Sequence, residues 1–284
     1  SLVRAGEVVS MEDAERRTVR LLNPALRDRQ ATTHTIQFSF QYVKSGEHAR
    51  PHRHTAAAFR FILKGSGAYT TVNGQKCVME EGDLIVTPQL SWHDHTNNSG
   101  KPIIWLDGLD IPLVQSLQQL LFEPYPEDAQ PIQKTSQQVG APQAIGTSTA
   151  EFFHYKWSDT NRRLKALDAS DRFDGYLLEY RNATTEGPTM PTIQCALSLL
   201  KPGQETQAHR HTSTVIYHAF RGRGSSFVGD ERFDWEMGDS FVVPLWYPHR
   251  HVNGAASEEA ILFSMSDAPV LKSLGLYREE AMGQ

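Results

Sequence analysis

Eight of the 12 histidines in this 284-residue chain stand in four His-x-His pairs. The pairs are His52 and His54, His93 and His95, His209 and His211, and His249 and His251. Residues i and i+2 of a β-strand point to the same face, so one pair can present two imidazoles to a metal ion. A closed barrel can bring His93 alongside as a third ligand. A lone pair is more often an ordinary structural feature, but two pairs that recur twice favour metal binding.

The chain contains an internal repeat. Residues 51–69 ("PHRHTAAAFRFILKGSGAY") have a near copy at 208–226 ("AHRHTSTVIYHAFRGRGSS"). His52 matches His209 at an offset of 157 residues, and His93 matches His249 at an offset of 156, so two modules of similar length follow each other. In both modules short apolar stretches such as "FRFILKG" and "DSFVVP" are separated by glycine turns. This pattern predicts antiparallel β-modules that close as jelly rolls or small barrels.

The repeat predicts three regions: an N-terminal module with a leading helix at 1–123, a linker at 124–149 and a C-terminal module at 150–284. The linker is rich in Pro, Gln, Ser and Gly and shows little periodicity. Ser10, Asp13 and Glu15 are typical of a helix start with a capping box, so we expect a helix over 11–22. A second short helix is expected at 113–121.

Composition argues against several partners. With 28 basic and 33 acidic residues the net charge is −5, and no run of Lys or Arg indicates nucleic acid or an anionic membrane. The apolar runs are only strand-sized and the N-terminus lacks signal-peptide order, so a cytoplasmic protein is expected. Cys77 and Cys195 are 118 residues apart without a CxxC motif. We interpret them as buried free thiols in a reducing compartment, which argues against a thiolate zinc site.

The residues around the histidines resemble the two motifs of the cupin superfamily, whose fold is a double-stranded β-helical jelly roll. The matching positions are Gly46, His52, His54, Gly65, Gly82, Pro88, His93 and Asn97, then Gly203, His209, His211, Gly222, Gly238, Pro244, His249 and Asn253. Many cupins have a glutamate ligand shortly after the second histidine, where this chain has Ala58 and Phe59, or Val215 and Ile216. Three neutral imidazoles leave a divalent ion its full charge and about three open positions, which suits a chelating dianion and a small third ligand. The missing glutamate argues against an oxalate-processing cupin.

Longer stretches narrow the resemblance. "HRHTAAAFRFILKGSGAYTTVNG", "MEEGDLIVTPQLSWHDHTN" and "WLDGLDIPLV" are similar to the gentisate 1,2-dioxygenase group, which includes relatives acting on salicylates and 1-hydroxy-2-naphthoate. The resemblance covers roughly residues 1–270 and implies an all-β bicupin, a homotetramer that cleaves aromatic rings with Fe(II). The implied ligands are His52, His54 and His93. The family usually carries a longer N-terminal segment, and its glycine before the third ligand is Leu90 here.

The resemblance also implies a reaction. A small aromatic hydroxy acid and O2 are the expected substrates, with gentisate cleaved to maleylpyruvate between its carboxyl-bearing and hydroxyl-bearing carbons. Salicylates and 1-hydroxy-2-naphthoate are alternative substrates. Two other classes stay open: a non-catalytic storage or sensing bicupin, and a metal-dependent isomerase or decarboxylase. Neither would consume oxygen, and three imidazoles alone would also accept zinc, copper or nickel.

Arg60 follows the first ligand by eight residues, where an arginine of this family grips the substrate carboxylate. A guanidinium suits that role because its planar fork pairs with a carboxylate and keeps its charge. Arg60 comes six residues after His54, so a continuous strand would turn both toward the barrel lumen. Tyr217 occupies the corresponding place in the second module. The first module is therefore expected to combine metal and carboxylate binding, whereas His209, His211 and His249 form either a vestigial metal site or a structural cluster.

The resemblance suggests three further pocket residues. His95 is expected to orient oxygen or relay protons, or else to bond nearby backbone. Gln41 matches a substrate-contacting glutamine. Arg16 matches an arginine that approaches the carboxylate from outside the barrel, although a solvated helix charge fits it nearly as well. Asp94 is expected to support the structure rather than catalysis.

Overall fold

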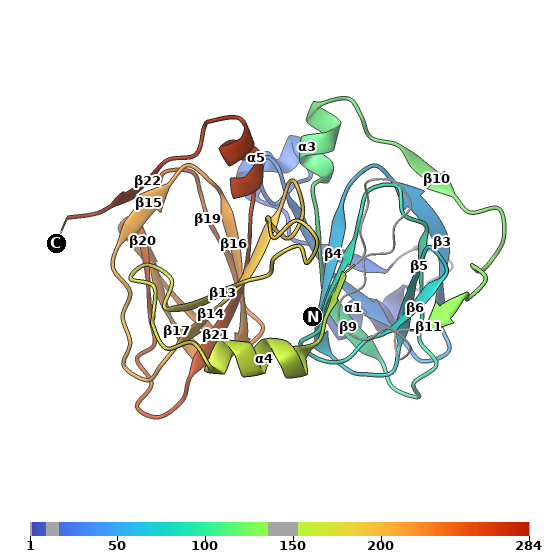
Figure 1. Ribbon diagram of the computed structural model, residues 1–284, viewed down its shortest axis with the longest axis horizontal. Coiled ribbons are helices and arrows are strands. Elements are labelled where there is room, and N and C mark those ends of the chain that lie inside the picture. The colour runs from blue at the N-terminus through green and yellow to red at the C-terminus, as the bar shows by residue number, and fades with distance from the viewer. Residues whose placement is uncertain (1, 10–16, 136–152, 284) are drawn as a thin grey trace. The chain divides into compact units, whose positions relative to one another are not determined.

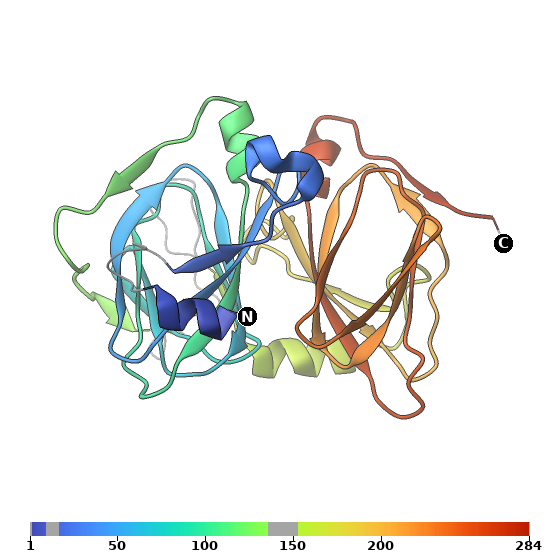
Figure 2. The ribbon, with the colours of Figure 1, turned by 180° about the vertical axis from the view of Figure 1, so that it is seen from behind.

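The computed structural model describes residues 2–9, 17–135 and 153–283, which divide into two compact units, 1–159 and 160–284. Each unit consists of two facing β-sheets (Figures 1 and 2). The described helices are few and short: α1 (Leu2–Val8), the 3-10 helix η1 (Pro24–Arg29), α3 (Ile111–Ser116), α4 (Trp157–Lys165) and α5 (Ala268–Ser273). The all-β class predicted from the glycine-punctuated apolar stretches is confirmed.

The first unit contains two six-stranded sheets. The first sheet has the order β1-β2-β9-β4-β7-β12 and consists of β1 (Thr18–Arg20), β2 (Gln37–Val43), β4 (Ala58–Lys64), β7 (Leu84–Thr87), β9 (Ile103–Leu109) and β12 (Phe153–Tyr155). The second has the order β10-β3-β8-β5-β6-β11 and consists of β3 (His48–His54), β5 (Tyr69–Val72), β6 (Gln75–Val78), β8 (His93–Thr96), β10 (Phe122–Pro124) and β11 (Lys134–Thr135). Both sheets are antiparallel except for the β11–β6 pair.

The second unit repeats this plan with two five-stranded sheets. One, ordered β13-β14-β21-β16-β19, contains β13 (Tyr176–Glu179), β14 (Gln194–Leu200), β16 (Val215–Arg221), β19 (Ser240–Val243) and β21 (Ala260–Ser266). The other, ordered β18-β17-β20-β15-β22, contains β15 (His209–His211), β17 (Arg223–Val228), β18 (Glu231–Glu236), β20 (His249–Val252) and β22 (Glu279–Ala281).

The helices and the linker expected from the sequence agree only in part with the observed elements. The helix expected over 11–22 is wrong at 18–20, where β1 pairs with β2; residues 10–16 lie outside the described ranges. The helix expected at 113–121 is α3, which begins and ends earlier. At the start of the expected linker, β10 and β11 pair with strands of the first unit, and β12 also pairs there with β7. The domain limits drawn from the sequence stay a prediction.

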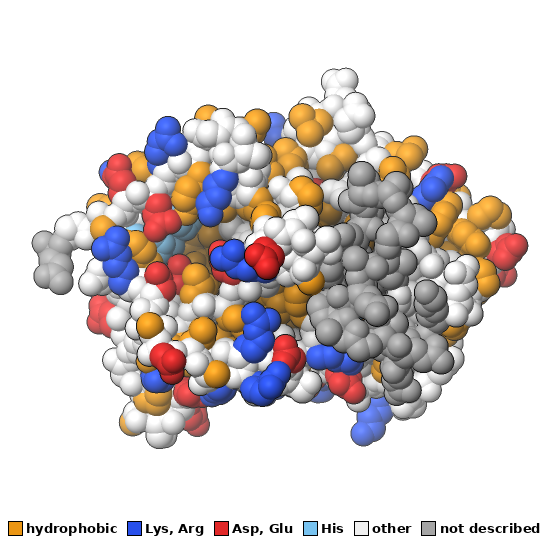
Figure 3. Space-filling model, viewed as in Figure 1, with side chains coloured by type: hydrophobic (Ala, Val, Ile, Leu, Met, Phe, Trp, Pro, Cys, Tyr) orange, Lys and Arg blue, Asp and Glu red, His pale blue; other side chains and the backbone are white. Residues whose placement is uncertain are grey.

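Each unit has an apolar core between its two sheets, and both cysteines are buried free thiols, as expected. Trp105 is the largest side chain fully enclosed in the first unit. Acidic and basic side chains are interspersed over the face drawn in Figure 3. Within residues 2–9, 17–135 and 153–283, no helix has the length and apolarity needed to cross a membrane.

The turn before β7 anchors the segment that follows residue 152. Gly82 has φ +86°, and a Cβ there would lie 2.6 Å from the Trp157 ring, so the position requires glycine. The next residue, Asp83, accepts hydrogen bonds from His154 Nε2 at 2.7 Å, Lys156 Nζ at 3.0 Å and the Trp157 amide at 2.8 Å. Burial raises the pKa of Asp83, but these donors and the charges of His154 and Lys156 bring it below its ordinary value.

Candidate metal centre and substrate pocket

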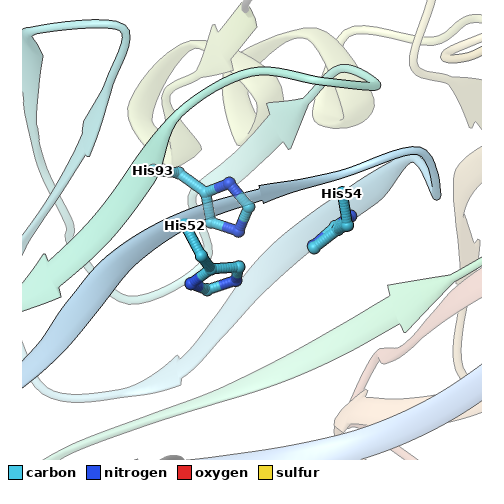
Figure 4. Close-up of side chains that lie close together, drawn as sticks. All are labelled: His52, His54 and His93. Atoms are coloured by element: carbon cyan, nitrogen blue, oxygen red, sulfur yellow. The ribbon is translucent and has the colours of Figure 1, made fainter. Parts of the chain in front are cut away.

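Three histidines converge inside the first unit (Figure 4). β3 carries His52 and His54, and β8 brings His93 directly opposite His52. One ring nitrogen from each lies within 4.8 Å of the others, and the ring centroids are 4.4 to 5.5 Å apart. The predicted convergence of the three imidazoles is therefore what the fold produces.

Hydrogen bonds fix which nitrogen of each ring faces its neighbours. The Nδ1 of His52, His54 and His93 lies 3.2, 2.7 and 2.9 Å from the backbone carbonyls of residues 50, 56 and 91. Carbonyl oxygens only accept, so Nδ1 carries the hydrogen and Nε2 keeps its lone pair. Three Nε2 lone pairs on buried imidazoles fit a borderline divalent ion such as Fe(II), and the backbone bonds hold the rings in place.

Beside the triad lies a cavity of about 420 Å³, a size that holds a single-ring ligand. Its walls come from both sheets. His52 and His54 contribute from one, and Gln41, Arg60 and Asp107 from the other. Arg60 therefore shares the cavity with the histidines, but the expected reason was wrong. The chain leaves β3 after His54 and crosses to the opposite sheet, so Arg60 faces the pair rather than following it on one strand.

Arg60 is a buried cation, only 2% exposed. Its Nη1 donates to Thr87 Oγ1 at 2.6 Å, and its Nε lies 3.5 Å from Asp107 Oδ1. Asp107 is held in turn by the Trp105 indole, which donates to Oδ2 at 2.9 Å. Burial lowers the pKa of Arg60, and the charge of Asp107 opposes that shift. A guanidinium so poorly solvated gains from a second carboxylate arriving through the cavity.

Gln41, like Arg60, is a buried polar residue that lines the cavity. It lies on β2, is fully buried, and neither amide atom has a hydrogen-bond partner among the described residues. Buried polar groups normally have partners, so this amide keeps its hydrogen-bonding capacity toward the cavity it lines. The same wall carries four polar residues that sequence reasoning missed: Thr18, Arg20, Gln37 and Ser39. Alternation along β2 would have indicated Gln37 and Ser39 once Gln41 was assigned to the pocket.

The rim of the cavity is formed by β10, which pairs with β3 at the histidines. Phe122 on β10 stacks on His52 with centroids 4.9 Å apart, yet is 54% exposed. Phe122 therefore covers a triad histidine while its own outer face meets solvent.

The other sequence candidates lie in three different places. His95 is buried behind the triad, 5.1 Å from Trp105 and 6.0 Å from His93 between ring centroids. Asp94 accepts from Gln130 Nε2 at 3.0 Å, and burial raises its pKa, which fits a structural role. Arg16 lies outside the described residues.

Leu90 stands where the cupin motif has a glycine before the third histidine. Its φ of +58° lies in the left-handed region, where glycine is favoured. Its amide donates to the His54 carbonyl at 2.8 Å, so this strained turn ties the loop before His93 to the strand of the other two histidines.

Comparisons with known proteins agree with this geometry. The family model described as "Cupin domain" matches residues 39–109 and 196–265. The 5-aminosalicylate 1,2-dioxygenase of Comamonas sp is 41% identical, with 99% of this chain and 78% of the relative covered. The 1-hydroxy-2-naphthoate 1,2-dioxygenase of Nocardioides sp. (strain KP7) is 40% identical, covering 94% and 72%. A salicylate 1,2-dioxygenase of Pseudoaminobacter salicylatoxidans, solved as adducts with gentisate, matches with a TM-score of 0.86 at 30% identity, covering 100% and 82%.

Two facing sheets with a histidine triad between them, present twice, define a bicupin. Within that class the chain belongs to the family of ring-cleaving 1,2-dioxygenases that act on gentisate, salicylate analogues and hydroxynaphthoate. It is accordingly an oxidoreductase that incorporates O2, and not a storage or sensing bicupin.

Proposed function

We propose that this enzyme uses Fe(II) to cleave gentisate between the carboxyl-bearing and hydroxyl-bearing ring carbons, giving maleylpyruvate. The observation that supports this proposal is that the histidine triad and a buried arginine face each other across one cavity. The triad of His52, His54 and His93 lies on one sheet, and the buried guanidinium of Arg60 lies on the other. A 2-hydroxybenzoate carries a phenolic hydroxyl beside a carboxylate, so it can meet both groups at once.

In this proposal the triad would hold the iron through its three Nε2 atoms. Iron held there would supply the redox chemistry needed to use dioxygen. Because residues 58 and 59 are Ala and Phe, no carboxylate from β4 competes with the substrate for the open positions. The protein's own contribution is to hold the imidazoles by their backbone hydrogen bonds so that each ring presents its Nε2 atom.

Arg60 orients the substrate and balances its charge. Its planar fork donates two hydrogen bonds to the carboxylate, and Asp107 and Thr87 hold the guanidinium at the cavity. The amide of Gln41, which has no hydrogen-bond partner in the described part of the chain, supplies a further hydrogen bond. These groups act by positioning and electrostatics, and none of them needs to transfer a proton.

The polar wall formed by β1 and β2 favours a substrate with a second polar substituent. Arg20, Gln37 and Ser39 line this wall, and the 5-hydroxyl of gentisate offers them a partner. That hydroxyl also makes the ring electron-rich and easier to oxidise. 5-Aminosalicylate shares both properties and is the second candidate, supported by the Comamonas relative. Salicylate and 1-hydroxy-2-naphthoate lack such a group and are expected to react more slowly.

The decisive experiment is oxygen uptake by anaerobically prepared, Fe(II)-loaded protein with gentisate, 5-aminosalicylate, salicylate and 1-hydroxy-2-naphthoate. We expect uptake with gentisate, a new absorbance from a ring-opened keto acid, and two labelled oxygen atoms in the product from 18O2. No uptake with any of the four, in protein shown to hold iron, would overturn the proposal. Uptake with another member of the panel would correct the substrate alone.

The assembly and location of the enzyme are part of the same proposal. By family resemblance we propose a cytoplasmic homotetramer. Light scattering on the purified protein tests the assembly, since a monomer would contradict it.

A further inference from the structure

The second unit contains a histidine cluster with the same frame as the first. His209 on β15 lies opposite His249 on β20, as His52 lies opposite His93. The centroid distances among His209, His211 and His249 are 5.4, 4.1 and 4.8 Å, against 5.5, 4.4 and 4.9 Å for the equivalent pairs of the first triad. One ring nitrogen from each again lies within 4.8 Å of the others.

Two of the three rings in the second cluster also keep the hydrogen bonds that orient a metal ligand, whereas His209 Nδ1 has no hydrogen-bond partner among the described residues. His211 Nδ1 donates to the carbonyl two residues later at 2.8 Å, and His249 Nδ1 donates to the carbonyl two residues earlier at 3.1 Å. The first triad uses the same relative positions. His249 Nε2 is consequently an acceptor, and it is buried without a hydrogen-bond partner among the described residues. Such an atom needs a ligand, and a cation satisfies it.

The surroundings differ in charge from those of the first triad. Tyr217, only 2% exposed, occupies the place of Arg60 and hydrogen-bonds to the carboxyl of Asp174. Asp171 and Glu279 add further negative charge near Asp174. Phe173 stacks on His209 with centroids 4.4 Å apart and is 6% exposed. The second cluster therefore has no buried guanidinium at that position for a substrate carboxylate. Arg172, the cation whose charge acts on His209, is exposed and lies over the Phe173 ring.

We propose that His209, His211 and His249 form a second metal site, which binds a divalent transition-metal ion and does not accept the aromatic acid. Imidazole donors select ions such as Fe²⁺, Co²⁺, Ni²⁺ and Zn²⁺ over Mg²⁺ and Ca²⁺. Histidine side chains are visible from outside on the unit drawn in orange and red in Figure 1 (Figure 3). Bound there, the ion joins β15 to β20.

Co²⁺ is the probe for this site, because its stoichiometry and visible spectrum can both be measured without turnover. Metal-free protein is dialysed against Co²⁺ and bound ions are counted by elemental analysis. We expect two ions per chain in the wild type, one in H52A/H93A, one in H209A/H249A and none in the fourfold variant. A wild type that binds one ion, or an H52A/H93A protein that binds none, would overturn the proposal. Circular dichroism checks folding, and H52Q/H93Q replaces the alanine pair if that pair misfolds.

Gentisate then tests whether the second site excludes the substrate. Its addition should change the Co²⁺ spectrum of H209A/H249A and leave that of H52A/H93A unchanged. A spectral change in H52A/H93A would show that the second site accepts the acid and would refute the exclusion. Because neither readout needs oxygen uptake, an enzyme inactive on the substrate panel would overturn the proposed function and leave this inference standing.

Discussion

Replacing Arg60 with Ala tests the central assignment of the pocket. A guanidinium can donate two parallel hydrogen bonds to a carboxylate, and hydrogen bonds to charged groups contribute about 1.5–3 kcal/mol each. The loss of about 3–6 kcal/mol corresponds to roughly a 100-fold to 10,000-fold decrease in kcat/KM, at about 1.4 kcal/mol per factor of ten. Oxygen uptake at varied gentisate concentration measures the decrease in kcat/KM, and we expect KM to rise and kcat to fall.

The same substitution should also destabilise the fold, and this loss of stability has to be separated from the loss of substrate binding. R60A leaves Asp107 buried without its cation, which should lower the free energy of unfolding by about 3–5 kcal/mol. R60A/D107N removes both charges and should recover much of the stability while staying inactive. R60K keeps the charge but loses the planar fork, so its activity should lie between the wild type and R60A. Urea unfolding of all three variants supplies the stability scale.

R232A is the matched control, because Arg232 is an exposed arginine of the second unit that pairs with Asp234. Its kcat/KM should equal that of the wild type. If R60A, shown to be folded, lost less than about tenfold in kcat/KM, the bidentate carboxylate contact would be refuted, since that loss is smaller than one charged hydrogen bond.

Three further predictions follow from particular contacts. Q41L removes a buried amide that has no partner in residues 2–9, 17–135 and 153–283, so stability should not fall while kcat/KM drops about tenfold. A loss of stability in urea unfolding would show that Gln41 serves the fold. D83N should destabilise by about 1.5–3 kcal/mol near neutral pH. Because the folded-state pKa of Asp83 is lowered, its contribution to stability is complete at pH values well above 3.8 and disappears as the pH falls through the folded-state pKa. The unfolding free energies of wild type and D83N should therefore converge in acid. A difference in stability that stayed constant with pH would contradict the assignment. L90G relieves a left-handed φ at an exposed position and should raise Tm by about 2 °C in a thermal scan, whereas a lower Tm would show that the Leu side chain outweighs the strain.

The fold was largely readable from the sequence because its signals are local. Alternating apolar stretches bounded by glycine specify strands, and the repeated histidine spacing specifies two similar modules. The helix expected over 11–22 failed at 18–20 because its signal competes with a pairing to β2, a partner distant in the chain. Propensity at one short segment does not reveal that an open sheet edge is available nearby.

The site was readable only in part. The triad was predictable because two ligands share a strand and the third comes from a matching motif. Asp107 was missed, since its importance arises from lying opposite Arg60 across the β4–β9 pair, a register that spacing does not show. Arg60 was placed in the pocket on the premise of a continuous strand, although the chain changes sheets between His54 and Ala58. Local sequence indicates which residues carry chemistry, but the pairing of distant strands decides which of them meet.

The strand β10 links the size of the opening to the metal ligands. Phe122 and Pro124 pair with His54 and His52 in one hydrogen-bonded ladder, and Phe122 also stacks on His52. A substrate that displaced β10 would therefore act on the same ladder that carries His52 and His54. We expect substitutions that move β10 to alter both the width of the opening and the alignment of the two imidazoles, whereas substitutions on the opposite wall should alter the width alone.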